Sequence, residues 1–166
     1  MALIIGYDLL IVRLHTLTTL DSELSFQSRL QVWQDTLYYV RDFPIIGSGL
    51  GTFAHTFPRY QSFSSEKTFF YSENDYLQLL AETGTVGSMV ALSIGSIFFF
   101  TVLKAWKKRT SRWSIILVTG GMSSLVSLLI HTSVDFNLHI PSNALLFCVI
   151  AALSYISAYS HRRTLQ

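Results

Sequence analysis

Two arginines and a glutamate are the residues of this chain best suited to chemistry on a charged substrate. Arg29 and Arg59 each offer a planar fork of N–H donors that binds phosphate oxygens in pairs and stays charged at physiological pH. Glu73 would serve as a general base if partly desolvated, because burial raises the pKa of a carboxyl group toward neutrality. The plainer alternatives are surface ion pairs for the arginines and a charge that favours a helix start for the glutamate.

A second set of ionisable residues, His131, Asp135 and His139, recurs at four-residue spacing. On one helix this spacing would stack three potential metal ligands on one face. Pro141 and the shortness of the segment argue against a regular helix through all three, so we expect no metal site. His131 is instead expected to end a membrane span with Asp135 as its partner, where it could also move protons.

The composition indicates a membrane protein. Half of the residues are hydrophobic and only 13% are charged, and the mean hydropathy is +0.41. The charges are also absent from long stretches of the chain, which is more typical of spans than of a soluble core. The net charge is +2 and no basic stripe with interleaved aromatics is present, so nucleic acid is excluded as the expected partner.

Three apolar runs, at about 88–104, 114–131 and 143–160, reach the length of a membrane span with their flanks. The connection from Lys104 to Arg112 is strongly basic, whereas 131–142 contains no lysine or arginine. The positive-inside rule therefore places the basic connection and the tail 161–166 in the cytoplasm. Residues 28–87 and 131–142 are then expected on the opposite, periplasmic side.

The first part of the chain, residues 1–27, contains an apolar stretch that is too short for a span. We interpret it as an interfacial segment or a truncated span. Three spans would leave the two ends of the chain on opposite sides of the membrane. We therefore expect an all-α membrane protein that is the C-terminal portion of a larger multi-span protein.

Residues 28–87 are predicted to hold two short helices. The first would open with a capping box at Ser28–Gln31, and its apolar stripe would contain Leu30, Trp33, Leu37 and Val40. It should end at Phe43, since a residue that precedes proline avoids the helical region. The three alternating glycines in 47–51 indicate a loop that approaches another group closely.

The second short helix is predicted to begin at Ser72, with Asp75 three residues later completing a capping box. Leu77, Leu80 and Ala81 would form its apolar face. Gly84 should stop this helix, directly before the first membrane span.

With these segments in place, the chain resembles the C-terminal part of the O-antigen ligase and O-antigen polymerase family over about residues 28–155. Four stretches carry the resemblance: an arginine-then-tryptophan helix, a proline–glycine loop, an asparagine followed after nine residues by Gly-x-x-Gly, and a His-to-Pro segment (28–33, 43–51, 73–87 and 131–141).

The resemblance implies a glycosyltransferase of cell-surface polysaccharide biosynthesis, such as that of lipopolysaccharide, in the bacterial inner membrane. Such a protein moves a glycan from an undecaprenyl-pyrophosphate carrier to an acceptor hydroxyl of a glycan, lipid or protein at the periplasmic face, without metal or nucleotide cofactors. Arg29 matches the family's arginine. Glu73 stands where the family has its catalytic histidine, so His131 is a second candidate base, and Asn74 and Asp135 are expected to support the site.

Two alternatives stay open beside this interpretation. One is a transporter-like relative of the inorganic-carbon type, which would need ionisable residues facing a pathway inside the spans. The ionisable groups here lie at the outer rim of the spans, which favours chemistry at the surface. The other alternative is a non-catalytic membrane fragment that assembles with other chains.

Overall fold

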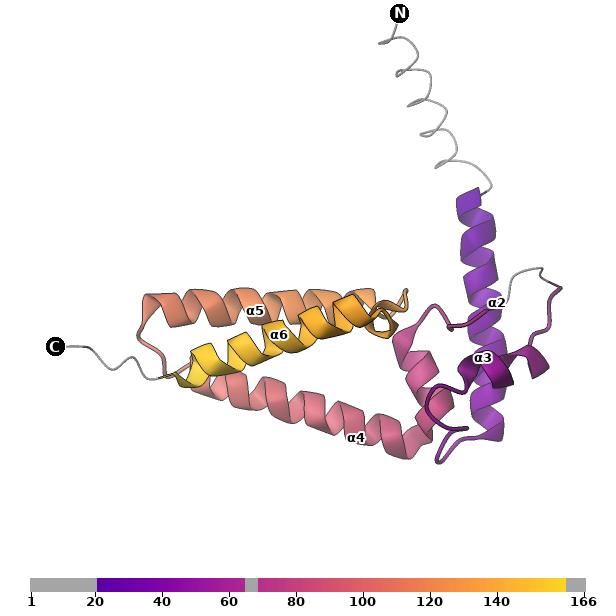
Figure 1. Ribbon diagram of the computed structural model, residues 1–166, viewed down its shortest axis with the longest axis horizontal. Coiled ribbons are helices and arrows are strands. Elements are labelled where there is room, and N and C mark those ends of the chain that lie inside the picture. Colours follow the sequence, from indigo (N-terminus) through magenta and orange to yellow (C-terminus); the bar gives the residue numbers. More distant parts are fainter. Residues whose placement is uncertain (1–20, 65–68, 161–166) are drawn as a thin grey trace, which may run out of the picture.

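The computed structural model describes residues 21–64 and 69–160, and within these residues every regular element is a helix. The order is α2 (Asp21–Asp42), α3 (Phe53–Thr56), η1 (Phe57–Arg59), α4 (Asp75–Trp106), α5 (Arg112–His131), η2 (Asn137–His139) and α6 (Pro141–Tyr159), as Figure 1 shows. The predicted all-α class is therefore confirmed. Most of the predicted segment 1–27 and all of the tail 161–166 lie outside the described residues.

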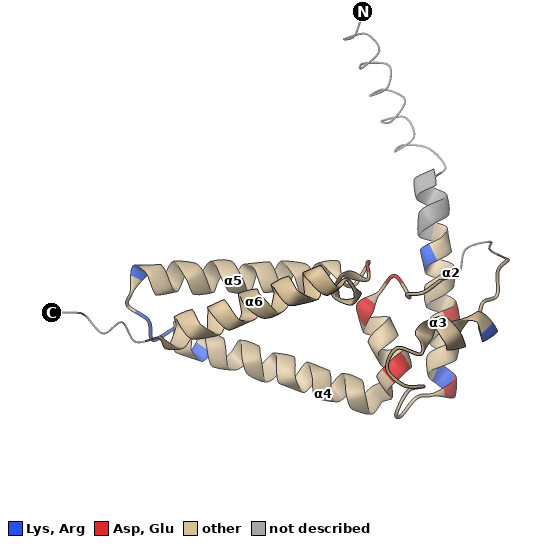
Figure 2. Cartoon of the chain, in the orientation of Figure 1, with Lys and Arg blue, Asp and Glu red and all other residues tan. Residues whose placement is uncertain are grey.

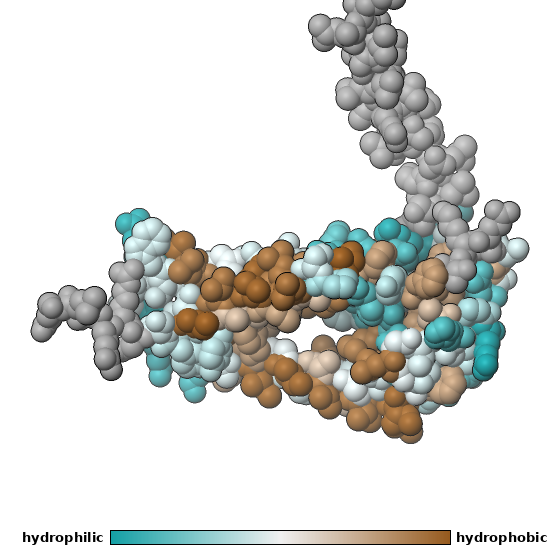
Figure 3. Space-filling view, in the orientation of Figure 1, coloured by the Kyte–Doolittle hydropathy of each residue, from teal (hydrophilic) through white to brown (hydrophobic). Residues whose placement is uncertain are grey.

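Three helices, α4, α5 and α6, are long and apolar enough to cross a membrane. Helices α5 and α6 begin and end close to the predicted runs 114–131 and 143–160, because charged or polar residues flank each run. Helix α4 ends close to the predicted run 88–104 but begins thirteen residues before it, at Asp75. Most of their large hydrophobic side chains are exposed, as expected for helices that face lipid. Figure 3 shows this brown hydrophobic surface along the helices, with teal hydrophilic surface at both ends.

The packing between α5 and α6 depends on a small residue. A Cβ atom on Gly121 of α5 would lie 2.1 Å from the hydroxyl of Ser154 on α6. Val102, Val118, Met122, Leu125 and Ala158 form the buried core where the three helices meet. Close approach at small residues is the usual way in which membrane helices associate.

Helix α4 is broken at Gly84, which has φ 64° and ψ −168°. The predicted stop at this glycine is therefore confirmed. In Figure 1 the part of α4 before the break lies crosswise to the part after it, and it bridges from that part to the ends of α5 and α6. The short first part, residues 75–83, is called the bridge below.

The loop at 44–51 supplies the hydrogen bonds that the break in α4 removes. A break leaves helical carbonyl and N–H groups without their usual partners, which is costly near a membrane. Four backbone hydrogen bonds of 2.9 to 3.2 Å restore them: Ser48 N–H to Ala81 O, Gly49 N–H to Glu82 O, Thr85 N–H to Pro44 O and Val86 N–H to Ile45 O. A Cβ atom on Gly47 would lie 2.2 Å from the Glu82 carbonyl oxygen, so the close approach predicted for this loop is confirmed.

Glu82 holds the other end of the same loop. Its side chain is buried, at 4% exposure, and its carboxylate accepts hydrogen bonds from the N–H groups of Gly51 (2.9 Å) and Phe53 (3.2 Å). The amide of Gln78 lies 3.3 Å from the same carboxylate. The fully buried face of the bridge is therefore mostly polar, and of the predicted apolar face only Ala81 is fully buried.

Helix α2 differs from the predicted short helix in two respects. It begins at Asp21, so Ser28 lies inside the helix and not at its start. It ends at Asp42, before Phe43 and Pro44 as predicted. The predicted region of two short helices also contains α3 and η1, which the aromatic loop sequence did not indicate.

The buried face of α2 carries Val32, Asp35, Thr36 and Tyr39, whereas Leu30 and Leu37 are exposed. The predicted apolar stripe is therefore wrong. The reason is that polar residues on the true face have specific partners: Asp35 accepts the N–H of Ser62 at 2.8 Å. Val32 and Tyr39 pack with Phe53, Phe57 and Ala81 in a mainly aromatic core between α2, α3, η1 and the bridge.

Candidate functional site

The start of α4 is attached to the segment that follows α5. The N–H of Asp75 donates to Thr132 O (3.0 Å), the amide of Asn74 donates to Ser133 O (2.8 Å), and the hydroxyl of Tyr76 donates to Leu129 O (2.7 Å). Residues 74–76 are therefore fixed to residues 129–133, at the end of α5 and just after it. This attachment fixes the start of α4, and with it Glu73 and Asp75, against the outer end of α5.

Asn74, and not Ser72, is the residue that caps α4. Its side-chain oxygen accepts the N–H of Leu77 at 3.0 Å. Ser72 is fully buried, and its hydroxyl donates to the carbonyl of Asn74 at 2.6 Å. The predicted capping box is wrong because Glu73, between these two residues, has a left-handed backbone that shifts the helix start.

Glu73 and Arg29 meet at this attachment. Arg29, on α2, places Nη2 3.7 Å from the Oε2 atom of Glu73, and it donates from Nη1 to Val134 O at 3.0 Å. The side chains are 39% and 23% exposed, respectively, so both are open to a ligand. Glu73 has φ 56° and is the only non-glycine residue at positive φ within residues 21–64 and 69–160. Such strain concentrates at functional sites.

The pKa of the Glu73 carboxyl group is raised from its ordinary value of 4.5. Desolvation by burial is the largest cause; the Arg29 charge lowers the pKa, and the nearby Asp135 carboxylate raises it. A raised pKa makes a carboxylate a stronger proton acceptor. Glu73 therefore combines a charged partner with the electrostatic setting of a general base.

His131 and Asp135 lie at the same end of the bundle. The His131 ring is 3.6 Å from the Asp135 carboxylate, as predicted for a histidine at the end of a span, and its side chain is 60% exposed. Asp135 also lies close enough to Glu73 for its negative charge to raise the pKa of the Glu73 carboxyl group. The structure thus brings together five of the predicted site residues: Arg29, Glu73, Asn74, His131 and Asp135.

Arg59 lies apart from this cluster. It is exposed at the end of η1 and has no ion pair with a described residue. The hydroxyl of its neighbour Tyr60 donates to Asp42, at the end of α2, at 2.7 Å. Asp42 is thirteen residues from Arg29 along this helix, or about 20 Å.

A second ionisable pair, Asp75 and His139, joins the same segments on the other side of Asn74. The Oδ1 atom of Asp75 is 2.5 Å from Nδ1 of His139. Sequence reasoning considered His139 only as a metal ligand. Its pairing with a residue 64 positions away has no local signal in the sequence. Within the described parts of the chain, no group of three His, Cys, Asp or Glu side chains could hold a metal ion.

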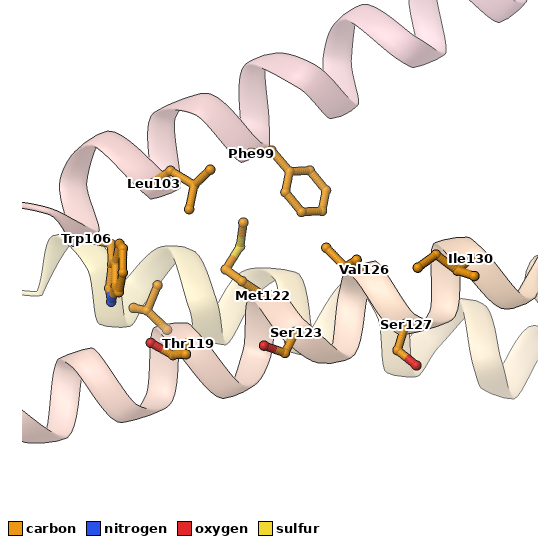
Figure 4. Close-up of a pocket in the computed structure, with 10 residues that line it drawn as sticks. Phe99, Leu103, Trp106, Thr119, Met122, Ser123, Val126, Ser127 and Ile130 are labelled. Atoms are coloured by element: carbon orange, nitrogen blue, oxygen red, sulfur yellow. The ribbon is translucent and has the colours of Figure 1, made fainter.

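A cavity of about 510 Å³ lies between α4 and α5, apart from the Arg29–Glu73 pair. In Figure 4 Phe99 and Leu103 point from α4 toward Met122 and Val126 of α5. The cavity extends along α5 as far as Ile130. A neighbouring hollow along α5 reaches His131. The mainly apolar lining of the cavity, called the apolar groove, therefore runs from Trp106 at the end of α4 to Ile130 near the end of α5 that carries the site.

The charges of the chain separate along the long helices. Figure 2 shows basic residues in blue at the connection between α4 and α5, and acidic residues in red at the opposite end, where α4 begins. The Arg29–Glu73 pair lies at that opposite end, since Asp75 is bonded to the residue after α5. The site and the basic connection therefore lie on opposite sides of the apolar region.

The sequence profile of the O-antigen ligase family matches residues 1–92. Arg29, Arg59, Glu73 and Asn74 lie inside this match, whereas His131 and Asp135 lie beyond its end. Comparison with curated proteins and with solved structures gave no match. Since the family match spans more than half of the sequence, the chain belongs to the O-antigen ligase family.

Proposed function

We propose that this protein transfers a glycan from an undecaprenyl-pyrophosphate carrier to an acceptor hydroxyl at the periplasmic face of the bacterial inner membrane. The family supports a glycosyltransferase-like activity in general. The observation that carries the finer proposal is the pair of Arg29 and Glu73, a half-exposed guanidinium 3.7 Å from a carboxylate whose pKa is raised. These are the two groups that transfer from a pyrophosphate requires.

The reaction places each group as follows. The acceptor oxygen attacks the anomeric carbon of the glycan, and the bond from that carbon to the pyrophosphate oxygen breaks. The leaving pyrophosphate keeps the electron pair, and Arg29 offsets its growing negative charge. Glu73 takes the proton of the acceptor hydroxyl. The products are the extended acceptor and free undecaprenyl pyrophosphate.

Binding of the donor would also prepare the base. Arg29 lowers the pKa of Glu73 through its charge. When pyrophosphate oxygens occupy the guanidinium, its charge is shared with the new anion, and the carboxylate becomes a stronger proton acceptor. The ion pair of the free protein thus becomes a donor site and a base in the complex.

The basic connection between α4 and α5 supports the proposed orientation in the membrane. The positive-inside rule assigns this connection to the cytoplasm, and so the Arg29–Glu73 pair to the periplasm. The apolar groove between α4 and α5 suits the isoprenoid chain of the carrier, because it joins the bilayer to the end of the helices that carries the site.

The other predicted site residues have supporting parts in this proposal. Asn74 caps the bridge and so fixes Glu73, and Asp135 raises the pKa of Glu73. His131 is a second candidate base, but it is far more exposed than Glu73. Arg59 would contact pyrophosphate only if the donor reached to η1.

A test is to express the full-length protein in a bacterium that lacks its own ligase and to measure transfer of the lipid-linked glycan. Wild type should transfer, whereas Arg29→Ala and Glu73→Gln should not, at equal membrane levels. Arg41→Ala, an exposed arginine in the last turn of α2, is the matched control and should transfer normally. Absence of transfer by wild type, or transfer by all variants, would contradict the proposal and favour the transporter-like or non-catalytic alternatives.

A further inference from the structure

The Asp75–His139 pair has the geometry of an oriented imidazole. Asp75 is only 6% exposed, and its two oxygens accept from Leu138 N–H at 2.8 Å and from His139 Nδ1 at 2.5 Å. Since a carboxylate only accepts hydrogen bonds, Nδ1 of His139 carries the proton in this contact. In the neutral ring the other nitrogen, Nε2, is then an acceptor.

The ring of His139 is fixed from a second side. Tyr71 lies 5.3 Å from it between ring centroids, and Tyr71 in turn stacks on Phe136 at 4.8 Å. His139 remains 30% exposed, and its Nε2 has no hydrogen-bond partner among the described residues. The buried Asp75 carboxylate and the Tyr71–Phe136 pair thus hold the His139 ring in a set position, and within the described part of the chain its Nε2 atom remains free to accept a hydrogen bond from a ligand.

This nitrogen lies next to the proposed reaction centre. Glu73 and Asp75 are two residues apart, so their Cα atoms are at most about 7 Å from each other. Asn74, between them, is tied to Ser133. The Glu73 carboxylate and the Asp75–His139 pair therefore flank Asn74 on one short stretch of backbone.

We propose that His139 Nε2 accepts a hydrogen bond from a sugar hydroxyl of the glycan substrate, and that Asp75 is the positioning residue that sets its tautomer. The proposal rests on the glycan transfer proposed above. A glycan presents many hydroxyl donors, so one glycan can engage Glu73 through its reacting hydroxyl and His139 through another. The aromatic ring of Tyr71 beside the imidazole offers the apolar surface that sugars also contact.

Three variants separate binding from structure. His139→Asn keeps an N–H donor for Asp75 but removes Nε2. His139→Gln places an amide oxygen near the position of Nε2 but gives up the bond to Asp75. Asp75→Asn keeps an oxygen for Leu138 N–H and turns an amide donor toward His139, which forces the proton onto Nε2 and so replaces the acceptor by a donor.

The measurement is the initial rate of transfer by the purified full-length protein, with donor and acceptor varied in turn. His139→Asn and Asp75→Asn should raise KM for one substrate roughly 3- to 10-fold, the value of one hydrogen bond, with kcat changed by less than about twofold. His139→Gln should recover part of the loss. The substrate whose KM rises identifies the sugar as that of the donor or of the acceptor.

Unchanged KM values for both substrates in His139→Asn would overturn the proposal, because they would leave His139 with a structural contact only. A fall in kcat at unchanged KM would also overturn it, since His139 would then act on the reacting proton. Both results are separable from loss of fold, because the Asn variant retains the bond to Asp75.

A binding measurement separates this inference from the proposed function. In ¹⁵N-histidine-labelled Glu73→Gln protein, the spectrum should show the Nδ1–H tautomer of His139, and added glycan should shift its Nε2 resonance without any transfer. If added glycan shifts the Nε2 resonance but the wild-type protein transfers no glycan, the proposed reaction is refuted and the sugar site is retained. Transfer by wild type with an unresponsive Nε2 would refute the sugar site alone.

Discussion

Arg29 and Glu73 form an ion pair of 3.7 Å between α2 and the residue that precedes the cap of α4, and Glu73 adopts φ 56° in doing so. A left-handed backbone costs free energy for a residue with a side chain, and so does partial desolvation of a carboxylate. The hydrogen bonds of Asn74 to Ser133 and of Asp75 to Thr132, just after α5, hold Glu73 in this position. The rest of the fold therefore holds the Arg29–Glu73 pair in place although the backbone and the desolvation of Glu73 both cost free energy.

The guanidinium fork of Arg29 should matter as well as its charge. Arg29→Ala is expected to lower transfer by about 10²- to 10³-fold, as removal of one preorganised electrostatic group does. Arg29→Lys should also lose at least about tenfold, because an ammonium group is a point charge without the paired donors that match a phosphate. Transfer rates in membrane vesicles would measure both, with Arg41→Ala as control. A fully active Arg29→Lys protein would show that the fork is not used.

The pH dependence of transfer should follow Glu73. Because the base must be deprotonated, kcat/KM should rise with pH, with a midpoint above 4.5, the ordinary pKa of glutamate. The midpoint should fall in Asp135→Asn, since Asp135 raises the pKa of Glu73, and should rise in whatever activity remains in Arg29→Ala, since Arg29 lowers it. Asp42→Asn, at the far end of α2, should leave it unchanged. A midpoint that rises in Asp135→Asn would contradict this assignment.

The strained backbone at Glu73 should affect the stability of variants at this position. Asparagine tolerates the left-handed region better than other residues with side chains, so Glu73→Asn should be about 0.5–1 kcal/mol more stable than Glu73→Gln, while both lose the base. Thermal unfolding of the two proteins in the same detergent would measure the difference. Equal stability of the two amide variants would mean that the backbone at Glu73 carries no strain.

Gly84 should tolerate no side chain. Its φ of 64° disfavours other residues, and a Cβ atom there would lie 2.3 Å from the Ile45 carbonyl oxygen. Gly84→Ala is therefore expected to cost about 2–4 kcal/mol and to detach the 44–51 loop from α4. Gly95→Ala, in the same helix with open space around it, should be nearly neutral. Unfolding of both variants in detergent would decide, and equal stability would show that the break is dispensable.

The parts of the fold that sequence reasoning predicted are those set by one local cause. The three long helices follow from charge-free runs of bilayer length, and the stop at Gly84 follows from the freedom of glycine at positive φ. The capping-box pattern at Ser28 misled, because the preceding residues also continue the helix. The buried face of α2 was missed because its polar member Asp35 is buried by bonding to Ser62, which is distant in the chain.

The candidate site shows the same division. The types of residue suited to the chemistry could be recognised from the sequence, and Arg29, Glu73, His131 and Asp135 do lie at one end of the bundle. Their partners could not, because the contacts join α2, the start of α4 and the segment after α5. The pairing of His139 with Asp75 depends on how that segment folds back, which no local pattern encodes.

The bridge before Gly84 also sets a distance. Its nine residues, 75–83, span about 14 Å at the usual helical rise. While this stretch stays helical, the part of α4 that follows Gly84 cannot close on the outer end of α5, and Figure 3 shows the opening that remains between the long helices. A molecule dissolved in the bilayer can therefore move sideways through lipid until it lies beneath the bridge, without first entering water. The number of residues in the bridge thus sets the width of the opening, and so the largest lipid-soluble molecule that can enter it.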